Sequence, residues 1–341
     1  MRLLNTLYLT EPALRVAARQ SSLEVRQDRS LVARFPLEGL EAIIMGPRIE
    51  ITTHAVARCV EHGIRVALLE HSGKLRYSVQ GPTRGNVALR VAQLRAADNP
   101  IAASHLAMSF VGGKLQNQRR LLQRWASDTP GTFINTLQTA QRAVERELQK
   151  VPAARDGDHL RGIEGNATRA YFKGLGAHIH RVVPQLAFTT RTRRPPLDPI
   201  NALLSYCYGL ALSEATGALD AVGLDPQIGY LHLLRPGRAS LALDLIEEVR
   251  PVLDRFAIRL LALRTLRPEH FETLANKAIR LTNEGRRTLL DNYEQHRNDE
   301  ISHGYLDRQI PRASLLPIQA TLLARTIRGD LDRYPPFIMT P

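Results

Sequence analysis

The chain has 341 residues, 44% of them hydrophobic, and a formal net charge of +13. This length and composition are typical of a globular protein with one large domain or, more readily, two, and no apolar run reaches the roughly 18 residues that a membrane-spanning helix needs. The positive charge favours a polyanionic partner, nucleic acid or a membrane surface, although surface charge can also serve solubility alone.

Both cysteines, Cys59 and Cys207, lie in apolar runs. They predict buried thiols in a reducing compartment rather than a disulfide framework. The N-terminal stretch MRLLNTLYLTE is too short and too polar for the apolar region of a secretory signal, so we expect a soluble, cytoplasmic protein. Aromatic residues make up only 5% of the chain, which disfavours base stacking on aromatic side chains as the main mode of nucleic-acid binding.

Residues 1–80 have the pattern of a small β-rich domain with one helix. Short apolar runs of strand type alternate with turn residues. We expect a helix over 53–63, capped by Thr52 or Thr53, and the Ser-Gly pair at 72–73 predicts a hairpin. The expected strands span residues 3–10, 13–18, 22–27, 30–36, 40–46, 64–70 and 75–81.

Residues 81–86, GPTRGN, form the expected linker, and nearly everything after them has helical periodicity. The predicted fold class is therefore α+β, with a small N-terminal β-rich domain followed by a large all-α domain over 87–330. Basic clusters recur at 105–126 and 133–151, where a solvated helix face is the default interpretation. Residues 331–341 are expected to form a flexible C-terminal tail or a docking peptide.

The stretch GIEGNATRAYF at 162–172 lies in an amphipathic helix whose apolar residues recur at helical spacing. Glu164 borders the apolar face, its i+4 neighbour is Thr168, and this helix offers it no basic partner. A half-buried, unpaired carboxylate is costly unless a cation neutralises it, and a metal ion would do so. The alternative is an exposed first-turn glutamate that interacts with the helix dipole.

A second stretch, residues 223–251, places a histidine and two acids close together in sequence. His232 lies within the apolar run YLHLL, and Asp244 and Glu247 share one face of the next predicted helix. Each signal has a structural alternative, namely a buried core histidine and an acidic helix start favoured by the macrodipole. Together with Glu164 they suit a hard cation, Mg²⁺ or Mn²⁺, because zinc usually draws more nitrogen or sulfur ligands.

Arginines precede the Pro-rich connection at 195–199, and RPGR at 235–238 forms a second basic loop. A phosphate clamp and a merely basic surface explain such loops equally well. A metal site in so basic a protein suggests phosphodiester chemistry, in which the metal polarises a phosphoryl oxygen and arginines hold the backbone. Spacing alone does not separate hydrolysis from strand transfer. The arginines that we expect to bind DNA are Arg169, Arg193, Arg194, Arg235 and Arg238.

Several motifs resemble those of the CRISPR-associated adaptation integrases, metal-dependent nucleases that insert new spacers into CRISPR arrays. The matches run from about residue 80 to residue 295, and the N-terminal β pattern is similar to the small β-domain of that family. The motifs, in chain order, are RGNVALRVAQLRAAD, GIEGNATRAYF, RPPLDPINALLSYCYGLAL, GLDPQIGYLH, PGRASLALDLIEEVRP and RLTNEGRRTLLDNYE.

The resemblance implies a prokaryotic, cytoplasmic endodeoxyribonuclease and DNA integrase that uses Mg²⁺ or Mn²⁺ and engages no membrane. It puts the catalytic metal ligands at Glu164, His232 and Glu247, with Asp244 as a secondary acid. Whether His232 is only a ligand or also carries protons stays open.

The resemblance also implies partners and a reaction. The substrates would be double-stranded DNA with single-stranded ends and the CRISPR repeat DNA, whose phosphodiester a 3′-hydroxyl attacks. A homodimer would work with a small ferredoxin-like adaptation partner protein, and the N-terminal domain would serve dimerisation and partner contacts.

Two other functions are consistent with the residues. One is a non-catalytic helical nucleic-acid-binding protein whose acids are structural, and the other is a metal-dependent hydrolase of small phosphates. DNA binding without any metal-dependent activity would favour the first. A steep salt dependence of DNA affinity would argue against the second, because a small substrate needs no extended cationic surface.

Overall fold

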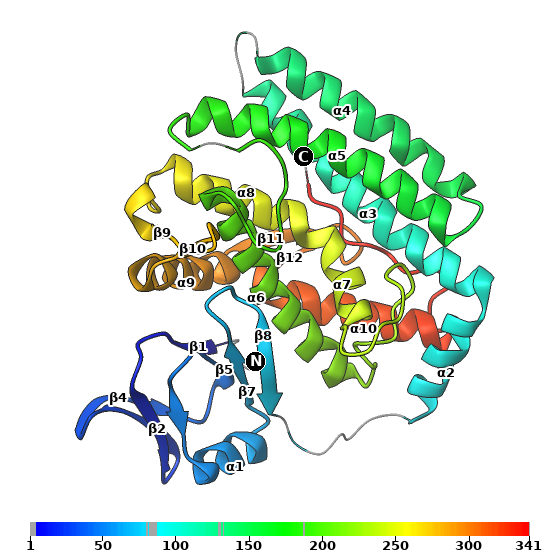
Figure 1. Ribbon diagram of the computed structural model, residues 1–341. Helices are drawn as coiled ribbons and strands as arrows, with labels where there is room; N and C mark the ends of the chain where they lie inside the picture. Colours follow the sequence, from blue (N-terminus) through cyan, green and yellow to red (C-terminus); the bar gives the residue numbers. More distant parts are fainter. Residues whose placement is uncertain are drawn as a thin grey trace.

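A strand-rich N-terminal part precedes a helical part in the computed structural model, as Figure 1 shows. The predicted α+β fold class is therefore confirmed. Of the predicted linker 81–86, residues 82–86 lie outside the described residues, and the domain limits stay a prediction. The structure describes residues 5–79, 81, 87–128, 131, 133–186 and 188–340.

Two four-stranded sheets and helix α1 (Thr53–Glu61) form the N-terminal part. The first sheet has the order β1-β5-β7-β8, with β8 antiparallel to its neighbour, and the second has the order β4-β3-β2-β6, with only β6 parallel to its neighbour. Of the two predicted caps, Thr52 and Thr53, the structure has Thr52, whose hydroxyl oxygen accepts a hydrogen bond from the Ala55 N–H at the start of α1. The strands are β1 (Asn5–Leu9), β2 (Leu14–Arg19), β3 (Ser22–Gln27), β4 (Ser30–Pro36), β5 (Leu40–Met45), β6 (Glu50–Ile51), β7 (Arg65–Leu69) and β8 (Leu75–Val79).

Strand β7 connects the two parts through its alternating side chains. Val66 belongs to the core of the N-terminal sheets, whereas the next residue, Ala67, belongs to the core of the helical part. Successive side chains of a strand point to opposite faces, so one strand serves both cores. The turn after β7 touches α6 closely, because a side chain at Gly209 would collide with the Gly73 carbonyl.

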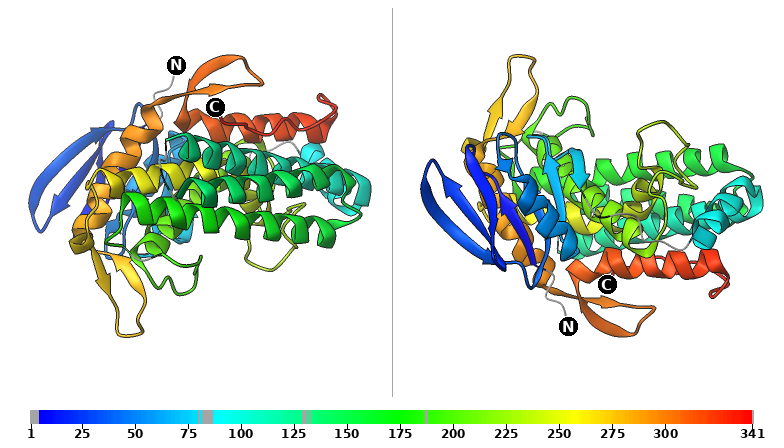
Figure 2. Two further views of the ribbon diagram at one scale, coloured as in Figure 1. Left: turned by 90° about the horizontal axis from the view of Figure 1, so that it is seen from above. Right: turned by 90° about the horizontal axis from the view of Figure 1, so that it is seen from below.

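The helical part is built around long helices that pack side by side. Helices α3, α4 and α5 run side by side and pack against one another (Figure 2). Helix α6 is buried along most of its length. The helices of the helical part are α2 (Val87–Asp98), α3 (Pro100–Ser127), α4 (Phe133–Lys150), α5 (Gly157–Val182), α6 (Pro199–Val222), α7 (Ser240–Ile246), α8 (Arg250–Ala262), α9 (Asn283–Asn298) and α10 (Leu315–Arg328). The 3-10 turns are η1 (Val151–Ala153), η2 (Glu247–Val249), η3 (Pro268–His270) and η4 (Arg312–Ser314).

Two short hairpins interrupt the helical part, where the sequence pattern predicted helix almost throughout. They pair β9 (Phe271–Thr273) with β10 (Ile279–Leu281), and β11 (Glu300–His303) with β12 (Arg308–Pro311). Strands of three or four residues are too short for a clear alternation of apolar and polar positions. None of the helices in the described ranges is long and apolar enough to cross a membrane.

The C-terminal segment, residues 334–339, packs on its own chain and is not a flexible tail. Tyr334, Phe337 and Met339 are buried. The amide of Asn117 on α3 donates a hydrogen bond to the Phe337 carbonyl and accepts one from the Met339 N–H. The segment is therefore packed on its own chain, against α3, η2 and α10.

Candidate active site

A buried lysine on α3 joins the two glutamates that the sequence singled out. The side chain of Lys114 is 4% exposed, and its ammonium nitrogen lies 2.6 Å from Glu247 Oε2. The same nitrogen contacts Glu164 Oε1. Helices α3 and α5 and the turn η2 thus bring one cation and two carboxylates together.

Lys114 corrects the sequence-based interpretation of Glu164. We expected that carboxylate to lack a basic partner, but only neighbours on its own helix had been considered. Its partner comes from another helix, 50 positions away in the sequence. The available signal was the run VGGKL at 111–115, in which a lysine stands among small and apolar residues of a helix.

His232 is oriented by Asp244 rather than by the glutamates. Asp244 is fully buried, and its Oδ1 lies 2.6 Å from His232 Nδ1. The same carboxylate accepts hydrogen bonds from the backbone N–H groups of Tyr230, Leu231 and His232. The other ring nitrogen, Nε2, therefore faces Glu247, and it lies 3.9 Å from Glu247 Oε1.

This contact also corrects the expected role of Asp244, which was to share a cation with Glu247 on one helix face. Helix α7 ends at Ile246, and Glu247 begins the 3-10 turn η2. The two carboxylates have different partners: Asp244 contacts the segment 230–232, whereas Glu247 contacts Lys114 and Arg250.

Cationic neighbours keep the buried Glu247 ionised. Burial alone would raise the pKa of this carboxyl, but the charges of Arg250, Lys114 and His232 hold its pKa well below the usual range. Arg250 Nε lies 3.0 Å from Glu247 Oε1, and the Arg250 guanidinium also lies over the ring of Tyr208, 4.5 Å from its centroid.

The donor set fits a hard divalent cation chemically. Two carboxylates and one imidazole nitrogen converge on the site, and oxygen-rich sets of this kind suit Mg²⁺ or Mn²⁺. Within the described part of the chain, no three His, Cys, Asp or Glu side chains are close enough to enclose a metal ion. The Lys114 ammonium contacts the carboxylates of both Glu164 and Glu247.

The C-terminal segment supports the residue next to Glu247. Burial raises the pKa of the Glu248 carboxyl to about 7. That carboxyl accepts hydrogen bonds from the Tyr334 hydroxyl at 2.6 Å, the Gln319 amide at 2.9 Å and the Phe337 N–H at 2.7 Å. This support was not visible in the sequence, because its members lie far apart in the chain.

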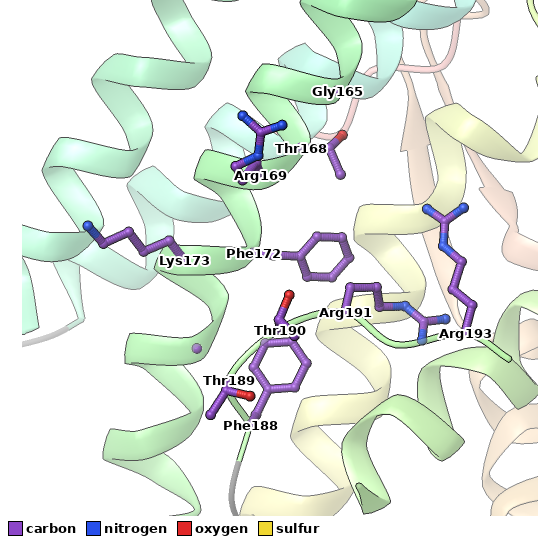
Figure 3. A pocket seen from close by; sticks show the side chains of 11 residues that line it. Gly165, Thr168, Arg169, Phe172, Lys173, Phe188, Thr189, Thr190, Arg191 and Arg193 are labelled. Carbon is purple, nitrogen blue, oxygen red and sulfur yellow. The ribbon is translucent and has the colours of Figure 1, made fainter. Parts of the chain in front are cut away.

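A basic pocket of about 560 Å³ adjoins Glu164. Figure 3 shows its lining: α5 contributes basic and aromatic side chains, and the segment before α6 contributes the rest. Thr168 connects the pocket to Glu164, because it lines the pocket and its hydroxyl donates a hydrogen bond to Glu164 Oε1 at 2.8 Å. The lining residues are Gly165, Thr168, Arg169, Phe172, Lys173, Gly176, Phe188, Thr189, Thr190, Arg191 and Arg193.

Glycines keep the approach to Glu164 open. A side chain at Gly162 or at Gly165 would meet no described atom within 4 Å. The sequence-based expectation that these positions allow another group to come near Glu164 therefore agrees with the geometry.

The five predicted DNA-binding arginines fall into two connected groups. Arg169 and Arg193 line the pocket. Burial and the charges of Arg235, Arg194 and Arg193 together lower the pKa of Arg238, so the last four are close enough to interact. We call residues 191–194 and 233–238 the arginine loops.

Known proteins match this chain over most of its length. A family model described as CRISPR associated protein Cas1 matches residues 7–295. A CRISPR-associated endonuclease Cas1 of Rhodospirillum rubrum is 39% identical, and one of Moorella thermoacetica is 37% identical, each over 98% of both chains.

Solved structures share the fold. A Cas1 protein from Thermotoga maritima matches with a TM-score of 0.80 at 21% identity over 99% of each chain. A casposase bound to an integration product matches with a TM-score of 0.84 at 21% identity, over 97% of this chain and 93% of its own. A chain of a Cas6-RT-Cas1–Cas2 complex matches with a TM-score of 0.82 at 25% identity, and this chain covers only 36% of it.

Proposed function

This chain belongs to the Cas1 family of CRISPR-associated proteins, and on that premise we propose that it is a metal-dependent DNA endonuclease and integrase of CRISPR adaptation. The 3′-hydroxyl of a captured DNA fragment attacks a phosphodiester at the repeat boundary. A new phosphorus–oxygen bond forms to the fragment and the bond to the repeat's own 3′-oxygen breaks. The attacking hydroxyl gives its proton to solvent, and the leaving 3′-oxygen takes up a proton to become a free 3′-hydroxyl. The observation that carries the proposal is the convergence of Glu164, His232 and Glu247 beside the basic pocket.

Glu164, His232 and Glu247 would hold the metal, Mg²⁺ or Mn²⁺. When bound, such an ion polarises the phosphoryl oxygen and stabilises the charge on the attacking or leaving oxygen. The side chains contribute orientation. In the metal-bound state the Nδ1–H of His232 would donate to Asp244, and Nε2, the ring nitrogen that faces Glu247, would be the ligand atom. Lys114 contacts one oxygen of each glutamate, and Arg250 donates to the other oxygen of Glu247, so both carboxylates are held in a fixed orientation.

The pocket supports a role in holding the single-stranded end of the DNA. Arg169, Lys173 and Arg193 are suited to phosphates, and Phe172 and Phe188 to the face of an unpaired base. These contacts read no base sequence, so the choice of target would come from DNA shape and from partners.

The partners are part of the same proposal. The likeness to a chain of a Cas6-RT-Cas1–Cas2 complex supports a small ferredoxin-like partner of the Cas2 type. We expect this chain to act as a cytoplasmic homodimer, with contacts made by the N-terminal sheets, as the resemblance in sequence implied.

A strand-transfer assay tests the proposal. The substrate is a branched DNA that mimics a half-integrated fragment, incubated with Mn²⁺, with Mg²⁺ or with a chelator. Joining is expected with either metal and not with the chelator, and Glu164→Ala should abolish it. Glu284→Ala, which changes an 80% exposed glutamate on α9, is the matched control and should keep full activity. DNA binding without joining, even after the partner protein is added, would instead favour the non-catalytic DNA-binding function.

A further inference from the structure

Two leucines face solvent directly after His232, in a loop that is otherwise basic. The side chain of Leu233 is 54% exposed and that of Leu234 is 59% exposed. Single exposed leucines are common on protein surfaces, but an adjacent pair beside a candidate active site forms an apolar patch. Since consecutive Cα atoms are about 3.8 Å apart, Leu234 lies within roughly 8 Å of His232 along the backbone.

The loop that carries these leucines is held at both ends. At its start, the His232 N–H donates a hydrogen bond to Asp244 at 3.0 Å. At its end, the Ser240 hydroxyl donates one to the Leu233 carbonyl at 3.0 Å. Ser240 is the first residue of α7, so its hydroxyl ties this loop to the start of that helix. The exposure of the leucines therefore follows from a fixed backbone and not from a frayed segment.

Arginines surround the leucine pair. Arg235 and Arg238 follow it in the same loop, and the other arginine loop lies close enough for Arg193 and Arg194 to act on Arg238. Positive charge of this density selects a polyanion. Leucine side chains bind no phosphate, however, and the apolar part of DNA that they can contact is the face of an unstacked base.

We propose that Leu233 and Leu234 form a wedge that enters DNA at the strand-transfer junction and separates one base step there. The inference rests on the proposed function, since it concerns the DNA that the active site attacks. Apolar wedges inserted between base steps unstack and kink DNA, while nearby basic residues hold the phosphates. The arginine loops supply that hold, and the opened step brings the target phosphodiester within reach of the site that begins at His232.

The first test measures base unstacking without chemistry. The probe is a branched DNA with 2-aminopurine at the junction, bound in the presence of a chelator. Wild type should raise the fluorescence, and L233S/L234S should reduce that rise by at least about fivefold while DNA affinity changes less than about threefold. The control L263S alters a leucine that is 64% exposed outside this loop and should behave as wild type. The proposed wedge is contradicted if wild type does not raise the fluorescence or if the double variant raises it as much as wild type does.

The second test asks whether a pre-opened target rescues the variant. On a fully paired target, L233S/L234S should join DNA about tenfold more slowly than wild type, and two mismatched pairs at the junction should restore most of that loss. Equal impairment on both targets would overturn the wedge, as would a defect that appears only in binding the partner protein. A fluorescence rise in wild type without any joining would leave the wedge in place and refute the proposed function.

Discussion

The cluster around Lys114 and the arginine loops use charge in opposite ways. In the cluster, Lys114 and Glu247 are almost fully buried, and each has partners fixed by the fold. In the loops, Arg193, Arg194 and Arg235 are exposed. Buried charges depend on exact neighbours because an unpaired one is costly, whereas exposed charges are screened and interchangeable.

This contrast assigns different duties to the two regions. The cluster fixes where a metal ion and a phosphate oxygen can lie, so a small change there alters chemistry and stability together. The loops gather DNA by summed electrostatic attraction, so a change there alters affinity in proportion to the charge removed. We therefore expect substitutions in the cluster to lower activity the most and substitutions in the arginine loops to lower it the least.

The largest effect is expected for Glu247→Gln. The amide keeps the shape but removes the charge that balances Lys114 and Arg250 and that would bind the metal. Strand transfer should fall by about a thousandfold or more, and the free energy of unfolding by about 3 kcal/mol, because a buried charge pair loses one member. Joining assays and denaturant titrations measure the two effects. Activity within tenfold of wild type would remove Glu247 from the site.

Lys114→Met separates positioning from metal binding. Without the ammonium, the carboxylates of Glu164 and Glu247 repel each other, so the metal-free protein should lose about 3 kcal/mol of stability. Strand transfer should fall by about a hundredfold, since the ligands lose their orientation.

Thermal unfolding with and without Mn²⁺ tests this prediction. The ion should stabilise Lys114→Met more than wild type, because it replaces the missing positive charge. Lys150→Met is the matched control: Lys150 also pairs with a glutamate, but its side chain is 55% exposed, so the substitution should change little. The same response to Mn²⁺ in variant and wild type would contradict a positioning role.

Glu247 and Lys114 also show how much of the fold and of the site can be predicted from the sequence. Periodicity and spacing predicted the order of strand-rich and helical parts, the cap at Thr52 and the presence of Glu164 and Glu247 on structured elements, because such signals are local. Lys114 was missed because its meaning depends on two partners from distant helices. For residues 331–341 the sequence left a flexible tail and a docking peptide open, and it did not indicate where the segment packs, since its anchor at Glu248 is visible only in three dimensions.

Asp244→Asn is expected to have an intermediate effect. The amide can keep some contacts to the backbone N–H groups of 230–232, but it orients His232 less strongly than a carboxylate does. Loss of such an outer-shell partner typically costs 10- to 100-fold in activity or metal affinity, and we expect about thirtyfold in strand transfer. Calorimetric titration with Mn²⁺ should show a matching loss of affinity. An unchanged Mn²⁺ affinity would mean that the contact to His232 is structural only.

The smallest effect on chemistry is expected for Arg193→Ala combined with Arg194→Ala. Each arginine that contacts a phosphate releases counterions, so removing both should lower the slope of log affinity against log salt by about two. Near 150 mM salt the affinity should fall about tenfold, while the rate of joining at saturating DNA should change less than about threefold, because neither side chain contacts Glu164, His232 or Glu247 in the structure. Fluorescence anisotropy across a salt series measures the slope, and single-turnover joining measures the rate.

The control is Arg19→Ala, a change of one arginine that is 66% exposed on strand β2, and it should leave the slope and the rate unchanged. A slope equal to that of wild type would show that these two arginines do not contact DNA, and the contrast between a catalytic cluster and a DNA-gathering surface would then have to rest on Arg169, Arg235 and Arg238 alone.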